Sequence, residues 1–293
     1  MYPGHGGSFP RRPAGAVTGR GRSLESSMLQ VEFAELSDTG RRRDHNEDYI
    51  GHVLPETPEL ARSRGWLFAL ADGVGGQDRG EVASRTAIES LLAGFLDAPP
   101  GESHTSLLPR LVQAANTHVH EAAMAPGKSS LTIATTLVAC ALRFDRAVVA
   151  HVGDSRCYLI RRSQTRALTR DHTVANEQFS MGLLSAREAA NVPTRHVLSR
   201  SLGNDLFVNT ETSEHQVLAG DVLVLCSDGL HGAMTPSEIA HIVGHSDDLA
   251  VAATKLVEVA NQQDGSDNIS VQLIRVRGVE RVGMYRGRPY KLL

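Results

Sequence analysis

The spacing of the apolar, β-branched runs is the sequence feature that most constrains the fold. Runs at residues 132–142, 147–152 and 157–160 follow one another with very short connections. Such connections join antiparallel strands, because a parallel pair needs a crossover of roughly a dozen residues or more. The chain is therefore predicted to build antiparallel sheets.

Other segments complete this picture. Further strand-like runs, bounded by Gly, Asp or Asn, lie at residues 29–36, 65–71, 207–215, 222–226 and 268–276. Apolar residues recur at helical spacing over residues 88–96, 107–119 and 249–260. A short helix is expected after Thr235, where Pro236 suits the first helical position and Glu238 completes a capping box. These elements predict a single α+β domain in which helices cover antiparallel sheets.

Composition narrows the class of protein. The chain has 293 residues, of which 41% are hydrophobic, so it can bury a sizeable core. Its net charge of −3 gives no case for binding nucleic acid or an anionic membrane. The three cysteines lie far apart in apolar surroundings, which indicates reduced thiols, and neither a spanning segment nor a signal sequence is recognised. We expect a cytoplasmic protein.

Four aspartates stand where strand-like runs meet a turn. Asp72, Asp154 and Asp228 end such runs, and Asp267 begins one. The end of one antiparallel strand lies beside the start of the next, so these carboxylates can gather at one sheet edge. Clustered carboxylates repel unless a cation neutralises them, and oxygen ligands favour Mg²⁺ or Mn²⁺. A single Asp-Gly pair is more often an ordinary turn, but four such boundaries predict a metal centre.

The segment from Ser37 to Asp48 carries a second set of charged side chains. A guanidinium here could hold a phosphate with two hydrogen bonds. Glu47 and Asp48 could orient water at a metal. Taken alone, the segment is equally well explained as a solvated charge cluster.

The order of these motifs resembles the metal-dependent serine/threonine phosphatases of type 2C (the PPM family) in their bacterial form. The resemblance runs from about Val31 to Val276. Each motif is short and weak alone, but six in this order and at these separations are specific. They are Gly40-x-x-Arg43-x-x-Asn46-Glu47-Asp48, Ala71-Asp72-Gly73-Val74-Gly75-Gly76, Ala134-Thr135-Thr136-Leu137, Val152-Gly153-Asp154-Ser155-Arg156, Ser227-Asp228-Gly229 and Asp267-Asn268-Ile269-Ser270.

The resemblance implies an α-β-β-α sandwich, two packed antiparallel sheets flanked by helices, that hydrolyses phosphoserine and phosphothreonine with metal-activated water. It implies two Mn²⁺ or Mg²⁺ ions and a third, weaker one. The matching metal ligands are Asp72 as the bridge, the Gly73 carbonyl, Asp228 and Asp267, with Asp154 at the third ion beside Asp228.

For the remaining site residues, the resemblance assigns phosphate binding to Arg43. Glu47 and Asp48 are assigned to metal-bound water. It also implies phosphorylated proteins as partners, a bacterial Ser/Thr kinase as the opposed enzyme, and a monomer.

Two positions depart from the family pattern. Val74 stands where animal members have a histidine proposed as general acid, which leaves metal-bound water and a nearby histidine such as His45 or His172 as open alternatives. Ala134 replaces a usual glycine, a change expected to alter only strand packing. A non-catalytic phosphoprotein binder and a nucleotide or small-phosphate esterase remain rival interpretations.

Three segments lie outside the predicted strands and long helices. Residues 1–28, rich in Gly, Pro and Arg, are expected to be a disordered tail before a catalytic domain at 29–278. Residues 171–204 are polar and are expected to form a flap beside the site. Residues 279–293 are a basic extension, in which a docked terminal strand is slightly favoured over a binding tail.

Overall fold

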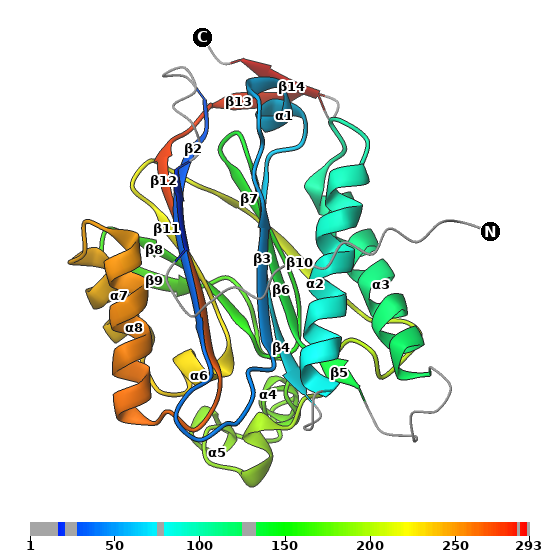
Figure 1. Cartoon of the computed structure of the whole chain (residues 1–293), viewed down its shortest axis with the longest axis vertical. Coiled ribbons are helices and arrows are strands. Elements are labelled where there is room, and N and C mark those ends of the chain that lie inside the picture. Colours follow the sequence, from blue (N-terminus) through cyan, green and yellow to red (C-terminus); the bar gives the residue numbers. More distant parts are fainter. Residues whose placement is uncertain (1–16, 21–27, 75–78, 125–132, 286–287, 292–293) are drawn as a thin grey trace.

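The computed structural model describes residues 17–20, 28–74, 79–124, 133–285 and 288–291. Two antiparallel sheets pack face to face between two pairs of helices, as Figure 1 shows. The predicted α-β-β-α sandwich is confirmed. No helix in these ranges combines the length and apolar character that crossing a bilayer requires.

The first sheet has the strand order β1-β2-β12-β11-β8-β9. Its strands are β1 (Val17–Arg20), β2 (Gln30–Asp38), β8 (Arg156–Arg161), β9 (Gln164–Ala167), β11 (Val222–Cys226) and β12 (Ile269–Gly278). The second sheet has the order β10-β7-β6-β4-β3, with β5 paired to β4. Its strands are β3 (Asp48–Val53), β4 (Trp66–Val74), β5 (Ala134–Thr135), β6 (Leu137–Arg143), β7 (Arg146–Val152) and β10 (Glu211–Gln216).

Helices cover the outer face of each sheet. Helices α2 (Arg79–Asp97) and α3 (His104–Ala123) lie against the second sheet, whereas α7 (Pro236–Gly244) and α8 (Leu249–Gln263) lie against the first. The shorter helices are α1 (Pro58–Ser63), α4 (Val174–Ser180), α5 (Ala186–Ala189), the 3₁₀ helix η1 (Pro193–His196) and α6 (Asp228–His231). The predicted capping box is present at α7, where Thr235 accepts from the N–H of Glu238 and Glu238 caps Thr235 in return.

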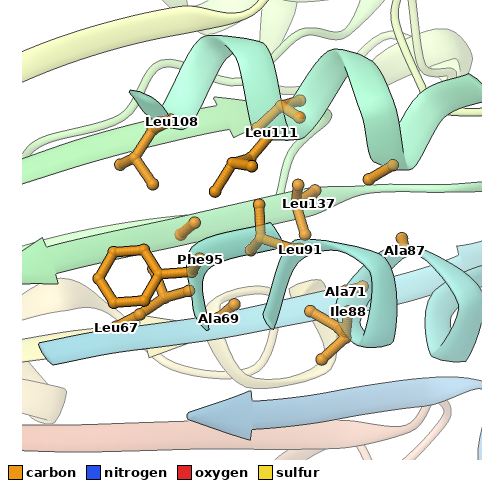
Figure 2. Packing of buried hydrophobic residues seen from close by; sticks show 14 of the residues in the cluster. Leu67, Ala69, Ala71, Ala87, Ile88, Leu91, Phe95, Leu108, Leu111 and Leu137 are labelled. Carbon is orange, nitrogen blue, oxygen red and sulfur yellow. The ribbon is translucent and has the colours of Figure 1, made fainter. Parts of the chain in front are cut away.

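Strand alternation divides the core into three layers. On β4, Leu67 faces α2 and α3, whereas its neighbour Phe68 packs between the two sheets. Figure 2 shows Leu91 and Phe95 of α2 meeting Leu108 of α3 in the first of these layers. A fully buried side chain of this size contributes about 1.5–3 kcal/mol relative to its exposed form. The strand ends that carry the predicted site are therefore held by three contiguous layers.

Several element predictions need correction. The predicted strand at 132–142 is interrupted at Thr136, which separates β5 from β6, and the strand at 207–215 is realised as β10. Strands β3 and β9 were not predicted, because their side chains are mostly polar or half-buried.

Both terminal segments also differ from expectation. Val17–Arg20, inside the predicted disordered tail, pairs with β2, and Met28 is buried in the core. The rest of that tail lies outside the described residues. In the C-terminal extension, Val282–Tyr285 (β13) pairs with Arg288–Lys291 (β14) as a hairpin instead of a single terminal strand.

Candidate metal centre

The register of the two sheets brings the predicted aspartates to one edge. In the first sheet, Cys226 pairs with both Arg156 and Val271. Asp154, Asp228 and Asp267 lie within a few residues of these three positions, so they emerge side by side. In the second sheet, Asp48 pairs directly with Asp72 across β3 and β4.

These carboxyl groups also act on one another electrostatically. The pKa of Asp72 is raised well above its ordinary value, first by burial and then by four neighbouring carboxylates, namely Asp48, Asp228, Asp154 and Asp267. Burial, followed by Asp228, raises the pKa of Asp154 to about 7. Without a cation, several of these groups would hold protons at neutral pH. The carboxylates of these aspartates thus lie near enough to Asp72 to act on its pKa, although among the described residues the group whose ligand atoms all lie within 4.8 Å of one another is His151, His172 and Glu211.

The donor set fits a hard divalent cation. Asp48 is only 6% exposed, and neither of its carboxylate oxygens accepts a hydrogen bond of normal geometry from the described residues. Burial raises its pKa to about 7, although the hydroxyl groups of Ser270 and Ser227 act in the opposite direction. The charge of a buried carboxylate whose oxygens lack hydrogen-bond donors can be neutralised by Mg²⁺ or Mn²⁺, which prefer oxygen ligands.

The side chain of Asn268 binds the charged segment 37–48 to the turn that carries Asp267. Its side-chain amide donates to the carbonyls of Thr39 and His45, both at 2.9 Å, and its Oδ1 accepts from the N–H of Glu47 at 2.8 Å. The guanidinium of Arg43 consequently lies beside the centre, with Nη2 donating to Asp267 Oδ2 at 2.7 Å. The side chain of Arg43 is 45% exposed, so it can also meet a ligand from solvent.

Glu47 is buried near Arg43 in the same segment. It is 8% exposed, and burial raises its pKa, whereas Arg43 lowers it. Its backbone carbonyl accepts from Ser84 Oγ at 2.6 Å and from the N–H of Gly73 at 3.2 Å. Glu47 is therefore fixed against both β4 and α2, next to the predicted metal ligands.

Two threonines hold the backbone of Asp72, a role that the sequence did not reveal. Thr136 Oγ1 accepts from the N–H of Asp72 at 3.0 Å, and Thr135 Oγ1 donates to the Asp72 carbonyl at 2.8 Å. Thr136 Oγ1 also lies 2.7 Å from Ser155 Oγ, which connects β4 to the turn of Asp154. Only the family order of motifs pointed to this Thr-Thr pair.

Close backbone approaches explain two glycines. Gly40 has a φ of +78°, and a Cβ there would lie 2.1 Å from the carbonyl oxygen of Asp267. At Gly73, a Cβ would lie 2.2 Å from the carbonyl oxygen of Gly80 in α2. Any side chain at either position would displace a predicted ligand-bearing turn.

The structure distinguishes the histidines that were considered as proton donors. His172 is 2% exposed and its ring is engaged with Gly153 and Glu211. His45 is exposed and close enough to Glu47 to lower that residue's pKa. Val74, in the position of the animal histidine, is 43% exposed. The burial and hydrogen bonds of His172 argue against its donating a proton to a substrate.

The family model described as protein phosphatase 2C matches residues 42–273. The serine/threonine phosphatase stp of Listeria innocua is 33% identical over 264 residues, covering 89% of this chain and 99% of that protein.

Solved structures agree with this match. The Mycobacterium tuberculosis serine/threonine phosphatase PstP/Ppp superposes with a TM-score of 0.75 at 29% identity, covering 85% of this chain and 100% of that one. The catalytic domain of a PstP in complex with two manganese ions has a TM-score of 0.72 at 30% identity, covering 85% and 99%.

A two-sheet sandwich with buried and half-buried carboxylates at one edge, together with the family match, identifies a metal-dependent phosphatase. The chain belongs to the protein phosphatase 2C family. The predicted family is confirmed, while the roles of individual site residues stay predictions.

Proposed function

We propose that this protein hydrolyses phosphoserine and phosphothreonine in other proteins, with water as the nucleophile, at a centre of two Mn²⁺ or Mg²⁺ ions. Asp72 would bridge the ions, and the Gly73 carbonyl, Asp228 and Asp267 would complete the protein ligands. Asp154 would hold a third, weaker ion together with Asp228. The proposal is supported by the strand register that brings these aspartates to one sheet edge, in a chain that matches the protein phosphatase 2C family model.

The chain's own residues supply binding and orientation. Divalent ions in such a site lower the pKa of water and neutralise charge that develops on a phosphoryl group. Arg43 would bind that phosphoryl group; the contact of its guanidinium with Asp267 and its exposure to solvent support this role. Glu47 and Asp48 are buried next to the ligands and would orient water through their carboxylate oxygens.

The choice of substrate and partner rests on the relatives. Proteins named serine/threonine phosphatase match almost their whole length to this chain, which supports a phosphoprotein substrate. We extend the proposal to a bacterial Ser/Thr kinase as the opposed enzyme, to a cytoplasmic location and to a monomeric state. These extensions follow from family analogy and the composition of the chain.

Each of the two rival functions differs from the proposed one in a testable property. A non-catalytic binder would have lost a metal ligand, whereas Asp72, Asp228 and Asp267 are all present and close together. An esterase for nucleotides or small phosphates shares the metal centre, so only substrate preference separates it from a protein phosphatase.

The test is hydrolysis of a phosphoserine peptide and of ATP in Mn²⁺, with a chelator control. We expect peptide hydrolysis that stops on chelation, little ATP hydrolysis, and a loss of at least about 100-fold in D228N. D247N removes an exposed carboxylate in the connection between α7 and α8 and should retain wild-type activity. Peptide hydrolysis that survives both chelation and D228N would contradict the proposed chemistry.

A further inference from the structure

His172, the second residue of the segment predicted as a flap, makes two hydrogen bonds with Gly153, the residue that precedes Asp154. Its backbone N–H donates to the carbonyl of Gly153 at 3.0 Å. In return, the N–H of Gly153 donates to His172 Nδ1 at 3.2 Å. One residue therefore satisfies both backbone groups of Gly153, and Asp154 follows directly.

These contacts assign the tautomer of His172. Because Nδ1 accepts from a backbone N–H, the ring proton lies on Nε2, which faces Glu211 Oε2 at 3.3 Å. Burial, followed by the charge of His151, lowers the pKa of His172 to about 4. The neutral ring can thus act as acceptor and donor at once at neutral pH.

The neighbouring side chains could be mistaken for a second metal site. Candidate ligand atoms of His151, His172 and Glu211 lie within 4.8 Å of one another. However, the two imidazole rings are stacked, with centroids 4.6 Å apart and planes inclined by 17°. Their nitrogen lone pairs lie in nearly parallel planes and cannot converge on one ion. His151 Nε2 also lies 2.9 Å from the carbonyl of Arg170, which satisfies it within the protein.

Both ends of the flap segment meet at the same place. The carbonyl of His172 accepts from the N–H of Ser199 at 2.9 Å, and the N–H of Val174 donates to the carbonyl of Val197 at 2.9 Å. A second connection lies beside it, because Arg156 donates twice to Asp171, at 2.8 and 2.7 Å.

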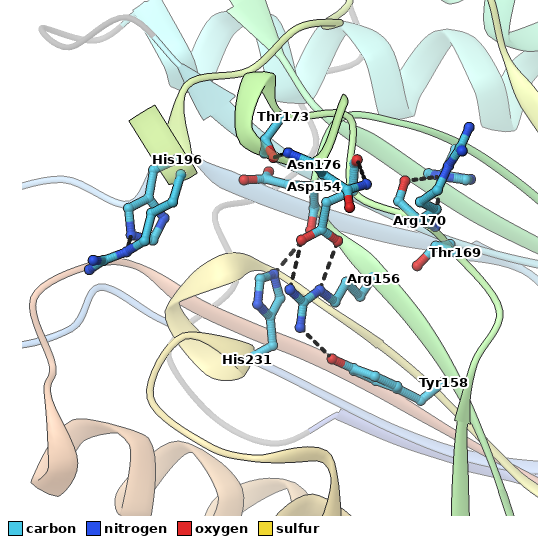
Figure 3. A network of polar contacts seen from close by, with 12 residues as sticks. Asp154, Arg156, Tyr158, Thr169, Arg170, Thr173, Asn176, His196 and His231 are labelled. Atoms are coloured by element: carbon cyan, nitrogen blue, oxygen red, sulfur yellow. Dashed lines mark hydrogen bonds and ion pairs between the residues drawn. The ribbon is translucent and has the colours of Figure 1, made fainter. Parts of the chain in front are cut away.

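Figure 3 shows that this connection continues into the flap and to α6. Arg156 also donates to the hydroxyl of Tyr158 at 2.9 Å, and Asn176 of α4 donates to the carbonyl of Asp171 at 2.6 Å. His231 Nε2 lies 3.0 Å from the carbonyl of Asp154. The turn of Asp154 is thus held by backbone contacts from His172, at the start of the flap, and from His231 of α6.

We propose that His172 is a positioning residue that holds the Gly153–Asp154 turn and couples the two ends of the flap segment to the Asp154 carboxylate. The metal part of this inference rests on the proposed role of Asp154 at the third ion. Loss of the Nδ1 acceptor would leave the N–H of Gly153 buried without a partner, so the turn would loosen. Groups that orient a ligand in this way typically change metal affinity about 10- to 100-fold when removed.

Two substitutions separate the two ring nitrogens. In H172N, the amide oxygen can take the place of Nδ1 and keep the bond to Gly153, while the contact with Glu211 is lost. In H172Q, the amide nitrogen can take the place of Nε2 and keep Glu211, while the acceptor for Gly153 is lost. Both variants remove the stacking on His151, so they form a matched pair.

We expect H172Q to raise at least 10-fold the Mn²⁺ concentration that half-saturates the weakest site, measured by calorimetry. Hydrogen exchange at the Gly153 amide should accelerate to the same degree. H172N should stay within about twofold of wild type in both measurements. Equal behaviour of the two variants, or loss of both properties in H172N, would overturn the proposal; the H172N arm remains informative even when H172Q does not fold.

D154N distinguishes this inference from the proposed metal site. If D154N leaves Mn²⁺ binding unchanged, the assignment of Asp154 to an ion fails. The difference in hydrogen exchange at the Gly153 amide between H172Q and H172N still tests the role of His172. If D154N weakens binding and the two His172 variants do not differ, the metal site stands and the positioning role is wrong.

Discussion

Replacing Asp154 by asparagine should stabilise the metal-free protein in a pH-dependent way. The Asp154 carboxyl is 7% exposed, and burial and Asp228 raise its pKa from 3.8 to about 7 in the folded protein. An acid whose folded pKa is raised favours the protonated folded state. Its contribution to stability is therefore lost as pH rises from about 4 to about 7.

The magnitude follows from this difference of about three pH units, at about 1.4 kcal/mol each. Asparagine does not titrate, so D154N should be more stable than wild type by about 4 kcal/mol at pH 8 and by about 2 kcal/mol at pH 5. Relief of the repulsion on Asp72 acts in the same direction.

Urea unfolding in the presence of a chelator measures this effect. The single tryptophan, Trp66, is 2% exposed, so its emission reports the loss of the core. Saturating Mn²⁺ should narrow this difference, because wild type gains more binding free energy than D154N; at 100-fold excess over the dissociation constant that gain is about 2.7 kcal/mol, less than the difference of about 4 kcal/mol expected at pH 8. A stability difference that is the same at pH 5 and pH 8 would refute the reasoning.

Three further substitutions probe the surroundings of the site. R43A removes the phosphate-binding guanidinium and should lower kcat/KM for a phosphopeptide about 100-fold, without a change in the urea midpoint; an unchanged kcat/KM would contradict this. T136V leaves the N–H of Asp72 without its acceptor and should lower the free energy of unfolding, measured in urea, by about 1–3 kcal/mol. An unchanged free energy of unfolding would show that this hydrogen bond does not stabilise the protein. G40A places a Cβ against the carbonyl of Asp267 at positive φ, so it should cost more than about 1 kcal/mol and weaken Mn²⁺ binding in calorimetry; wild-type binding would count against the geometry.

The sequence predicted the sheets well because short connections restrict strand pairing. Runs at 147–152 and 222–226 appear in the structure with little change, as β7 and β11. Strand β3 was missed because only its first and last residues are buried, so it lacks an apolar run. Every residue of β3 pairs with a residue of β4, and this pairing holds β3 in the sheet. Such pairing between strands is a tertiary effect that the hydrophobic pattern of a single segment does not reveal.

The acidic cluster was predictable for a physical reason, whereas its supports were not. Strand ends fix where Asp72, Asp154, Asp228 and Asp267 emerge, and antiparallel pairing places those ends together. The hydrogen bonds of Asn268 and the Thr135–Thr136 pair depend on side-chain rotamers and on approaches between distant segments. No spacing along the chain encodes such contacts.

The most direct test of the account is a crystal structure of the protein grown in excess Mn²⁺, with anomalous scattering used to locate the metal. We predict two strong peaks between the carboxylates of Asp72, Asp228 and Asp267, and a weaker one beside Asp154. An active protein whose crystals place no manganese among these side chains would contradict the claim that they form the catalytic centre.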